Sequence, residues 1–443
     1  MDRRGFLRST AVSAGVLALG PSFWRTAYAA PAQPGAGYGA LGGPDANGIR
    51  LPPGFTSRVV ATSGQPVGTS VWHPFPDGGA TFSLPDGGWI YVSNSEVPGA
   101  GGVGAVRFDA AGNIAGGHRV LAGTSLNCAG GRTPWGTWLS CEEFDFGHVW
   151  ECNPNGLNAN ATALRRALGT FSHEAAAVDP VRKHVYLTED KPDSRFYRFT
   201  PANPANWPDL SAGTLEAAVA TPVTPVDPTD PRWTVTWLPI PNPNPTPLET
   251  PTRQQLPATT AFNGGEGCWF DTDTVYFTTK GDNRVWALNA ATSVLELVYD
   301  DNLAATPTLT GVDNVTVNAA GELFVAEDGG DMQIVVIAPD RTFAPLLQIV
   351  GQNGSEITGP AFDPSGTRLY FSSQRGPGAG TGAGITYEVR GPFNGGAAGV
   401  PAAGNGLLSG LVHEVVEPPV RSSAPPIADV VHTVDRGLAG LGL

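Results

Sequence analysis

Acidic side chains recur at the ends of short apolar segments in this chain. Six such segments each end in a polar and mostly acidic group. They are WIYVSNSE (89–96), TWLSCEE (137–143), HVYLTED (184–190), TVYFTTKGD (274–282), ELFVAEDGG (322–330) and RLYFSSQRG (368–376). Carboxylate oxygens are the ligands that Ca²⁺ prefers in proteins. If folding brings these groups together, the sequence predicts a cation site.

A second set of polar side chains precedes the expected hairpin turns by five residues. The turns are marked by Thr133, Asp179, Asp271, Asn318 and Asp363. Counting back five residues from each turn gives Cys128, Glu174, Glu266, Asp313 and Thr358. Four of these five residues carry a thiol or a carboxylic acid, so this position is a candidate for metal binding.

The spacing of the segments predicts an all-β fold. Neighbouring segments lie about 47 residues apart, with one step of about 90, and a strand-rich repeat of this size is typical of a β-propeller. Each segment is preceded by a strand and a turn rich in Asp, Asn, Pro or Gly, and is followed by a further strand. We therefore predict a six-bladed β-propeller.

The propeller geometry explains why both sets of side chains should meet. The innermost strand of a blade lines the channel, and the second strand returns antiparallel to the rim at which the first began. Residues that open the first strand and residues that close the second therefore share one face. We expect Cys128, Glu174, Glu266 and Asp313 to lie at this rim with the acidic segment ends.

Carboxylates that are crowded around one axis need compensation. Either their pKa rises and they stay protonated, or they bind cations. Several oxygen ligands suit Ca²⁺, whereas a thiolate among carboxylates suits a transition metal such as iron. The alternative for any one acid is that it accepts hydrogen bonds from the amides of a hairpin turn.

The longest step in the repeat falls between the third and fourth units. Residues 201–258 are rich in Pro, Asn, Thr and Trp. They form either a long insertion or a degraded seventh blade, and the insertion is favoured because proline cannot donate to a strand ladder. The C-terminal residues 427–443 predict either a closing strand or a short helix.

The N-terminal residues 1–29 predict an export signal. Arg3 and Arg4 begin a twin-arginine pattern, a short apolar run follows, and Ala27-Tyr28-Ala29 is a small-residue cleavage site. The apolar run is too short to span a bilayer. We expect the twin-arginine machinery to export the folded chain, which leaves residues 30–443 as a single propeller domain in the periplasm or outside the cell.

The net charge of the chain is −14. An acidic chain without a basic patch argues against nucleic acid as a partner, because it cannot neutralise phosphates. We expect a monomer that acts on a small molecule.

The four cysteines give no simple pattern. Cys128, Cys141, Cys152 and Cys268 have no CxxC spacing that would indicate zinc or haem. Outside the cytoplasm they can pair as disulfides, so disulfide, metal thiolate and buried thiol all remain open.

The run NCAGGRTPWGTWLSCEE (127–143) closely resembles the signature of PhoX-type alkaline phosphatases. The segments SHEAAAVDP with VYLTED, and DNVTV with LFVAEDGG, are similar to further blocks of that family. The resemblance covers most of residues 50–390. It implies a six-bladed propeller, twin-arginine export, and a channel cluster of Ca²⁺ and iron that a Cys thiolate and Glu carboxylates hold.

The resemblance also implies ligands by position: Glu96, Glu174, Glu266 and one of Cys128 and Cys141. The repeat register favours Cys128, whereas the adjacent Glu142 favours Cys141. With the other acids of the rim, the predicted metal ligands are Glu96, Cys128, Cys141, Glu142, Glu143, Glu174, Glu189, Glu266, Asp313 and Glu327.

One position departs from the family pattern. The phosphatases carry a phosphate-binding arginine just before the glutamate that corresponds to Glu266, and Gly265 stands there in this chain. Other cations along the chain, namely Arg132, Lys191, Lys280 and Arg375, could take its place. The residues that we assign to catalysis are Glu174, Glu266, Arg132 and Arg375.

The resulting hypothesis is an exported hydrolase that cleaves small phosphomonoesters with Ca²⁺ and iron, the iron as Fe³⁺. Two alternatives stay open. A Ca²⁺-dependent lactonase of the propeller type predicts a single metal and no thiolate ligand. A non-catalytic binding propeller predicts structural Ca²⁺ and no ester turnover.

Overall fold

A computed structural model describes residues 37–156, 162–227, 231–303, 307–378, 380 and 382–395, all within the compact unit Met1–Gly406. The predicted signal segment 1–29 and the C-terminal segment 427–443 lie outside these residues. In the described part the chain forms β-strands and short 3-10 turns, and no helix there is long and apolar enough to cross a membrane.

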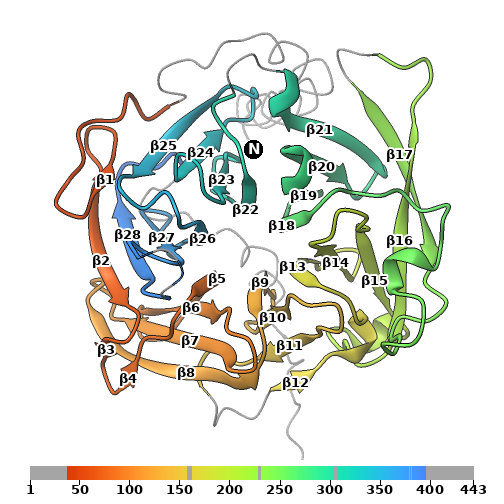
Figure 1. The fold of residues 1–443 in the computed structure, drawn as a ribbon, viewed down its shortest axis with the longest axis horizontal. Helices are drawn as coiled ribbons and strands as arrows, with labels where there is room; N and C mark the ends of the chain where they lie inside the picture. The colour runs from red at the N-terminus through yellow and green to blue at the C-terminus, as the bar shows by residue number, and fades with distance from the viewer. Residues whose placement is uncertain are drawn as a thin grey trace, which may run out of the picture. The chain divides into compact units, whose positions relative to one another are not determined.

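Antiparallel sheets are arranged around a common axis like the blades of a propeller (Figure 1). One four-stranded sheet contains β5 (Pro76–Ser83), β6 (Trp89–Ser95), β7 (Gly101–Phe108) and β8 (Ile114–Thr124). The next contains β9 (Asn127–Arg132), β10 (Trp138–Glu142), β11 (Val149–Cys152) and β12 (Ala163–Leu164). In both sheets the strands follow chain order, as the repeated hairpins predict.

The central third of the chain forms a nine-stranded sheet. One part contains β13 (His173–Asp179), β14 (His184–Glu189), β15 (Tyr197–Pro201) and β16 (Gly213–Pro222). The other part contains β18 (Gly265–Asp271), β19 (Thr274–Thr279), β20 (Arg284–Asn289) and β21 (Val294–Asp300). Strand β17 (Arg232–Pro239) pairs with both β16 and β21 and so joins the two parts.

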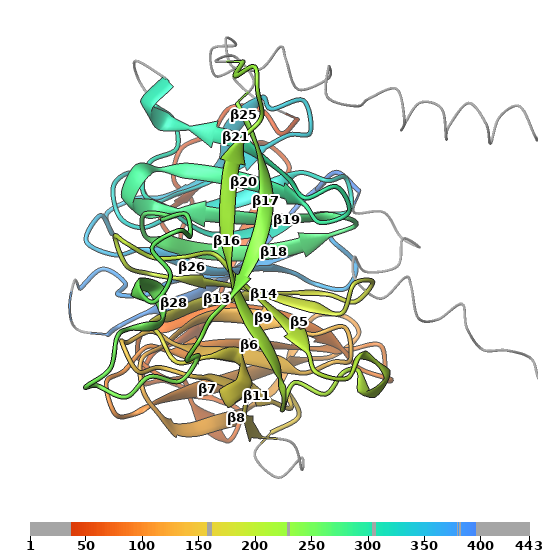
Figure 2. The same cartoon turned by 90° about the vertical axis from the view of Figure 1, so that its right-hand side faces the viewer.

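The Pro-rich region 201–258 thus contributes the long hairpin β16–β17, which Figure 2 shows running along the outer side of the strands. All-β structure with a propeller-like arrangement is confirmed. The six-blade count stays a prediction, because the two four-stranded parts of this region form one continuous sheet.

Two more large sheets complete the arrangement. A five-stranded sheet contains β1 (Ile49–Arg50), β22 (Val312–Val317), β23 (Leu323–Glu327), β24 (Gln333–Ile337) and β25 (Phe343–Ile349). A four-stranded sheet contains β2 (Thr56–Thr62), β26 (Ile357–Phe362), β27 (Arg368–Ser373) and β28 (Ile385–Arg390). A small hairpin is formed by β3 (Pro66–Val67) and β4 (Ser70–Val71). Because β2 pairs with β28, the two ends of the described chain are held in one sheet.

The innermost strands contact one another in a closed cycle. Strand β5 contacts β9, and the contacts continue through β13, β18 and β22 to β26, which contacts β5. The apolar core lies between neighbouring sheets, where buried rings such as those of Tyr91 and Tyr370 pack at 5.2 Å between centroids. This cycle holds the beginnings of the inner strands close together.

Candidate functional site

The second residue of each innermost strand has a similar chemical character. In five of the six strands it is a carboxylic acid or a thiol. The six residues are Asp77, Cys128, Glu174, Glu266, Asp313 and Thr358. All six lie near the start of their strand, on the same side of the ring of inner strands. Five ionisable groups are therefore brought to a single rim.

A β-bulge follows this residue in the inner strands. The pairing of β13 with β14 shifts between His173 and Ala176, and the pairing of β18 with β19 shifts between Gly265 and Cys268. The ladders of β5, β9, β22 and β26 are irregular at the equivalent place. A bulge re-aims a side chain and increases the local twist. The repeated bulge therefore gives these residues a common orientation.

The first residue after each second strand forms a further ring at the same rim. Each ring residue directly follows the last residue of its strand, and these strands are β6, β10, β14, β19, β23 and β27. The six residues are Glu96, Glu143, Asp190, Lys280, Asp328 and Gln374. This ring mixes four acids with one cation and one amide, so it can both bind a cation and compensate charge.

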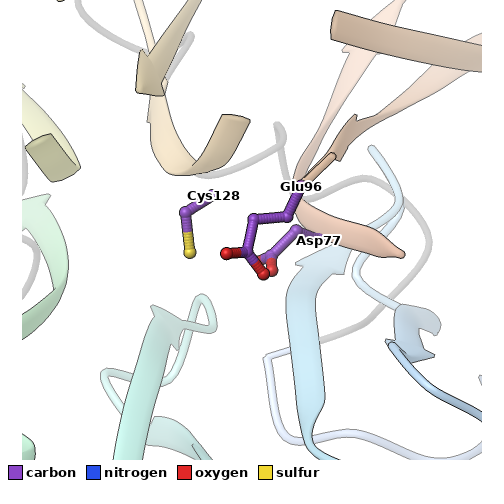
Figure 3. Close-up of side chains that lie close together, drawn as sticks. All are labelled: Asp77, Glu96 and Cys128. Carbon is purple, nitrogen blue, oxygen red and sulfur yellow. The ribbon is translucent and has the colours of Figure 1, made fainter. Parts of the chain in front are cut away.

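Four overlapping groups of potential metal ligands result, each with three ligand atoms within 4.8 Å of one another. They are Asp77–Glu96–Cys128, Cys128–Glu143–Glu174, Glu174–Glu266–Asp313 and Asp313–Asp328–Glu356. Neighbouring groups share a residue, so together they form one centre, which we call the rim centre. Figure 3 shows the carboxylates of Asp77 and Glu96 and the thiol of Cys128 turned toward the same space.

Burial and mutual repulsion disfavour ionisation in the rim centre. Burial, together with Glu96, raises the pKa of Glu143 to about 8. Burial also raises the pKa of Asp313 to about 7, although Lys280 opposes this shift. The pKa values of Asp77 and Glu174 are raised in the same way, by burial first and then by neighbouring acids. Bound cations would reverse these shifts, because positive charge favours the carboxylate form.

Two basic side chains partly compensate the acids. Lys280 Nζ lies 2.8 Å from Glu266 Oε1 and 3.3 Å from an oxygen of Asp328. Arg375 Nη2 lies 2.7 Å from Glu356 Oε1. Burial alone lowers the pKa of Lys280, but Glu266, Asp313 and Asp328 outweigh it and the pKa is raised overall. Lys280 therefore stays charged within the rim centre.

Gln374 links the two acids of the first sheet. Its Nε2 donates to Asp77 Oδ2 at 2.6 Å and to Glu96 Oε2 at 2.7 Å. The side chain is 1% exposed, and its Oε1 has no hydrogen-bond partner among the described residues. A neutral donor thus separates two acids that would otherwise repel each other.

The donor set fits bound cations. Glu174 is 1% exposed and its Oε2 has no hydrogen-bond partner among the described residues, while Cys128 Sγ lies 3.3 Å from Glu174 Oε1. A buried carboxylate oxygen without a partner is costly unless it binds a proton or a cation. The sulfur of Cys128 suits a transition metal, and the all-oxygen group around Asp313 suits Ca²⁺.

Three of the predicted ligand acids lie outside the rim centre. Glu142 accepts hydrogen bonds from the amides of Ser125 and His148. Glu327 accepts hydrogen bonds in the same way from the amides of Thr310 and Gln333. These two acids therefore have the turn-amide role that was the alternative to metal binding.

The third acid, Glu189, accepts hydrogen bonds from Tyr197 at 2.6 Å and from Arg253 at 3.2 Å. Arg253 comes from the Pro-rich region, and it also contacts Asp193 at 2.9 Å. The Pro-rich region therefore reaches the rim through this arginine.

The four cysteines differ in surroundings. All are free thiols, so the structure contains no disulfide among them. Cys141 is fully buried in an apolar cluster with Leu139 and Leu187, whereas Cys128 belongs to two of the ligand groups. Of the two cysteines proposed from the sequence, the structure brings Cys128 into the rim centre.

The two predicted catalytic arginines lie at opposite ends of the inner strands. Arg375 contacts Glu356 at the rim centre. Arg132 ends β9, whose second residue is Cys128, and its guanidinium lies 5.6 Å from the centroid of the Phe82 ring. The structure therefore brings Glu174, Glu266 and Arg375 together and leaves Arg132 apart from them.

Sequence reasoning missed three rim residues, Asp77, Asp328 and Glu356. Asp77 begins the inner strand of the first sheet, where no turn residue was used for counting. Asp328 lies in the acidic segment 322–330, but its neighbour Glu327 was the residue predicted as a metal ligand. Glu356 precedes β26 by one residue, outside the counted position. The Asp77-Gly78-Gly79 run, which places small residues after a ligand as in Cys128-Ala129-Gly130, was a usable signal for Asp77.

The fold and site define an all-β protein of propeller type with an acidic, thiol-containing centre at one rim of its channel. Residues 98–296 match the family model of alkaline phosphatase PhoX, which confirms the resemblance over that part of the chain. Among curated proteins, none matches the sequence.

Solved structures resemble the chain at low sequence identity. A gluconolactonase from Xanthomonas campestris is 15% identical, with 80% of this chain and 98% of that chain covered and a TM-score of 0.42. A protein of unknown function from Bacteroides thetaiotaomicron is 8% identical, with 76% of each chain covered and a TM-score of 0.47. We infer nothing about the reaction from these structures.

Proposed function

We propose that the protein is an exported, metal-dependent hydrolase of small phosphomonoesters, with its active site at the rim centre. The observation that carries the proposal is the continuous centre from Asp77 to Glu356, which combines a thiol with carboxylates and lies beside Lys280 and Arg375. The match of residues 98–296 to the PhoX phosphatase family supports this assignment.

Cations of two kinds suit the two sides of the rim centre. Cys128 with Glu143 and Glu174 would hold iron, and Glu266, Asp313, Asp328 and Glu356 would hold Ca²⁺ through oxygen alone. When bound, such cations supply positive charge that stabilises a phosphoryl group in its transition state.

Lys280 and Arg375 are the proposed phosphate-binding cations. They replace the family arginine whose position Gly265 occupies here, and both already lie within 4.0 Å of a carboxylate of the rim centre. A guanidinium matches two phosphate oxygens at once, and an ammonium acts as a point charge. We exclude Arg132 from the reaction, because it lies at the other end of β9.

The remaining expectations belong to the same proposal. The parts β13–β16 and β18–β21 act as separate blades bridged by β17, which gives six blades in a single domain of residues 30–443 with an insertion at 201–258. Residues 1–29 direct the folded, metal-loaded chain through the twin-arginine route to the periplasm or the medium. There it acts as a monomer and binds no nucleic acid.

The decisive experiment measures metal content and turnover in the same purified protein. We expect calcium and iron by elemental analysis, and p-nitrophenyl phosphate hydrolysis that chelation abolishes and metal restores. Cys128→Ser should lower iron content and turnover at least tenfold, and Cys141→Ser should keep both. Turnover of a lactone with calcium alone would favour the lactonase alternative. Calcium without turnover of any ester would favour the binding propeller.

A further inference from the structure

One buried position recurs in the second strand of each sheet, two residues before the ring residue of the rim centre. All six side chains at this position are at most 1% exposed. They are Asn94, Cys141, Thr188, Thr278, Ala326 and Ser372. A polar group that is buried in this way needs a hydrogen-bond partner inside the protein. The partners therefore show what the position does.

Three of these side chains donate a hydrogen bond to the backbone carbonyl of the proposed ligand in the following sheet. The pairs are Asn94 with Cys128 at 2.9 Å, Thr188 with Glu266, and Thr278 with Asp313 at 2.5 Å. Where the following inner strand has Thr358 instead of an ionisable ligand, the position is Ala326, which has no side-chain donor. The bonds cross from one sheet to the next, so they tie each of these ligands to the neighbouring sheet.

The hydroxyl of Thr188 is used on two sides. Its Oγ1 accepts a hydrogen bond from the amide of Ala175 at 3.0 Å and donates its own proton to the carbonyl of Glu266. Ala175 directly follows Glu174 and lies in the β-bulge of β13, where the ladder with β14 shifts. Thr188 therefore joins the backbone beside Glu174 to the backbone of Glu266.

The hydroxyl of Thr278 extends this connection to the third acid of the same ligand group. Glu174, Glu266 and Asp313 place their ligand atoms within 4.8 Å of one another. They come from three different strands, β13, β18 and β22, which pack together without pairing to each other. The spacing of the three carboxylates therefore depends on contacts between these strands, and the two hydroxyls are such contacts beside the ligands.

We propose that Thr188 and Thr278 are positioning residues, which hold Glu174, Glu266 and Asp313 at the spacing that a bound cation needs. This inference rests on the proposed function, because it concerns the same metal centre. Both hydroxyls are engaged by backbone groups, so they act on a cation only through its ligands. Without them the strands can move apart, and a cation must draw the carboxylates together again when it binds.

Calcium titration of the full-length, chelated protein tests this role without measuring activity. Thr188→Val and Thr278→Val keep the shape of the side chain and remove only the hydroxyl. Each should weaken calcium binding about tenfold, which is the usual effect of removing a group that orients metal ligands. Thr188→Ser and Thr278→Ser keep the hydroxyl and should bind calcium with nearly native affinity.

Thr81→Val is the matched control. Thr81 is 4% exposed, and its Oγ1 also donates to a carbonyl of another sheet, that of Phe362 at 2.5 Å. It follows Asp77 by four residues in β5, so it lies roughly 13 Å along the strand from the rim. Thr81→Val should lower the melting temperature as much as the other two valine variants do, but it should bind calcium normally.

The outcomes distinguish this proposal from the proposed function. Native calcium affinity in both Thr188→Val and Thr278→Val overturns the positioning role and leaves the proposed function intact. An equal loss of affinity in Thr81→Val overturns the positioning role as well, because affinity would then follow stability. Serine variants that bind as weakly as the valine variants overturn it too, because the hydroxyl would then be irrelevant. A native protein that binds no calcium overturns both proposals.

Discussion

At the residue scale, neighbouring acids at the strand ends have opposite roles. Glu142 accepts hydrogen bonds from two backbone amides, while Glu143 belongs to a ligand group with Cys128 and Glu174. The cause is the alternation of side chains along a strand, which turns successive residues to opposite faces. One residue of the pair therefore stabilises the sheet, and the next faces the channel.

The Glu142–Glu143 pair provides a matched test. Glu143→Gln should weaken cation binding at least tenfold at pH 8, because it removes a channel carboxylate. It should also stabilise the metal-free protein at this pH, because the ionisation of Glu143 no longer opposes folding. Glu142→Gln should keep the metal content but lower the free energy of unfolding by about 1–3 kcal/mol, because an amide cannot accept both backbone bonds. Elemental analysis and urea unfolding measure the two effects, and a loss of metal from both variants would contradict the assignment.

Gln374 is the second residue whose role can be tested. Gln374→Leu removes both donors that hold Asp77 and Glu96, so the two acids should separate and the adjacent Cys128 group should lose affinity for cations by about tenfold. Isothermal titration with Ca²⁺ and Fe²⁺ measures this change. Gln352→Leu is the control, because Gln352 is also buried but donates to Tyr387, and it should bind metal normally. Equal affinities in the two variants would show that Gln374 has no positioning role.

The residue scale also shows what the sequence could predict. Counting from the turns found Cys128, Glu174, Glu266 and Asp313, because the hairpins β9–β10, β13–β14, β18–β19 and β22–β23 have similar lengths. It missed Asp77, because none of the turn residues used for the count belongs to the hairpin β5–β6. It assigned Arg132 to catalysis as one of four candidate cations, although an extended strand separates Arg132 from Cys128.

At the element scale, the inner strands approach one another at small residues that come directly after the proposed metal ligands in the sequence. A Cβ atom on Gly267 would lie 2.6 Å from the backbone nitrogen of Val315 and 2.8 Å from Cα of Asn314, both in β22. Glu266 immediately precedes this glycine and Asp313 precedes Asn314. The close approach of β18 and β22 therefore sets how near the two carboxylates lie. The sequence showed the glycine but not the contact, since strand packing between sheets is a tertiary property.

Gly267→Ala tests this approach. The added methyl group must push β18 away from β22, so we expect the free energy of unfolding to fall by about 1–3 kcal/mol and the metal affinity to fall as well. Gly43→Ala is the control, because a Cβ atom there meets nothing within 4 Å, and it should change neither quantity. Chemical unfolding and calcium titration of both variants measure the outcome. A Gly267→Ala protein with native stability would show that the strands can relax without cost.

At the scale of the whole molecule, the closed cycle of inner strands concentrates negative charge at one rim. Each strand contributes few acids, but the cycle places them together, and few cations, among them Lys280 and Arg375, lie close to them in the described part of the chain. For this reason the sequence repeat predicted where the rim centre lies better than it predicted which residues make up the rim centre. The period identifies which residues converge, whereas the balance between acids, amides and cations depends on individual residues such as Gln374 and Lys280.

The excess of acids in the rim centre predicts that the stability of the metal-free protein falls as the pH rises. Glu143, with a pKa raised to about 8, and Asp313, with a pKa raised to about 7, bind protons more tightly in the folded chain than in the unfolded chain. Their contribution to stability is complete below the ordinary carboxylate pKa near 4 and is lost as the pH rises to about 8. The melting temperature of chelated protein should therefore fall between pH 5 and pH 8.

Added calcium should reverse this fall, because a cation replaces the protons that are lost. The calcium-induced rise in melting temperature should be several degrees larger at pH 8 than at pH 5. Sodium chloride of equal ionic strength is the control for simple screening, and it should have a smaller effect at both pH values. Changing both Glu143 and Asp313 to their amides should flatten the pH dependence and remove most of the calcium effect. A calcium effect that is the same at both pH values would mean that the acids of the rim centre do not exchange protons for cations.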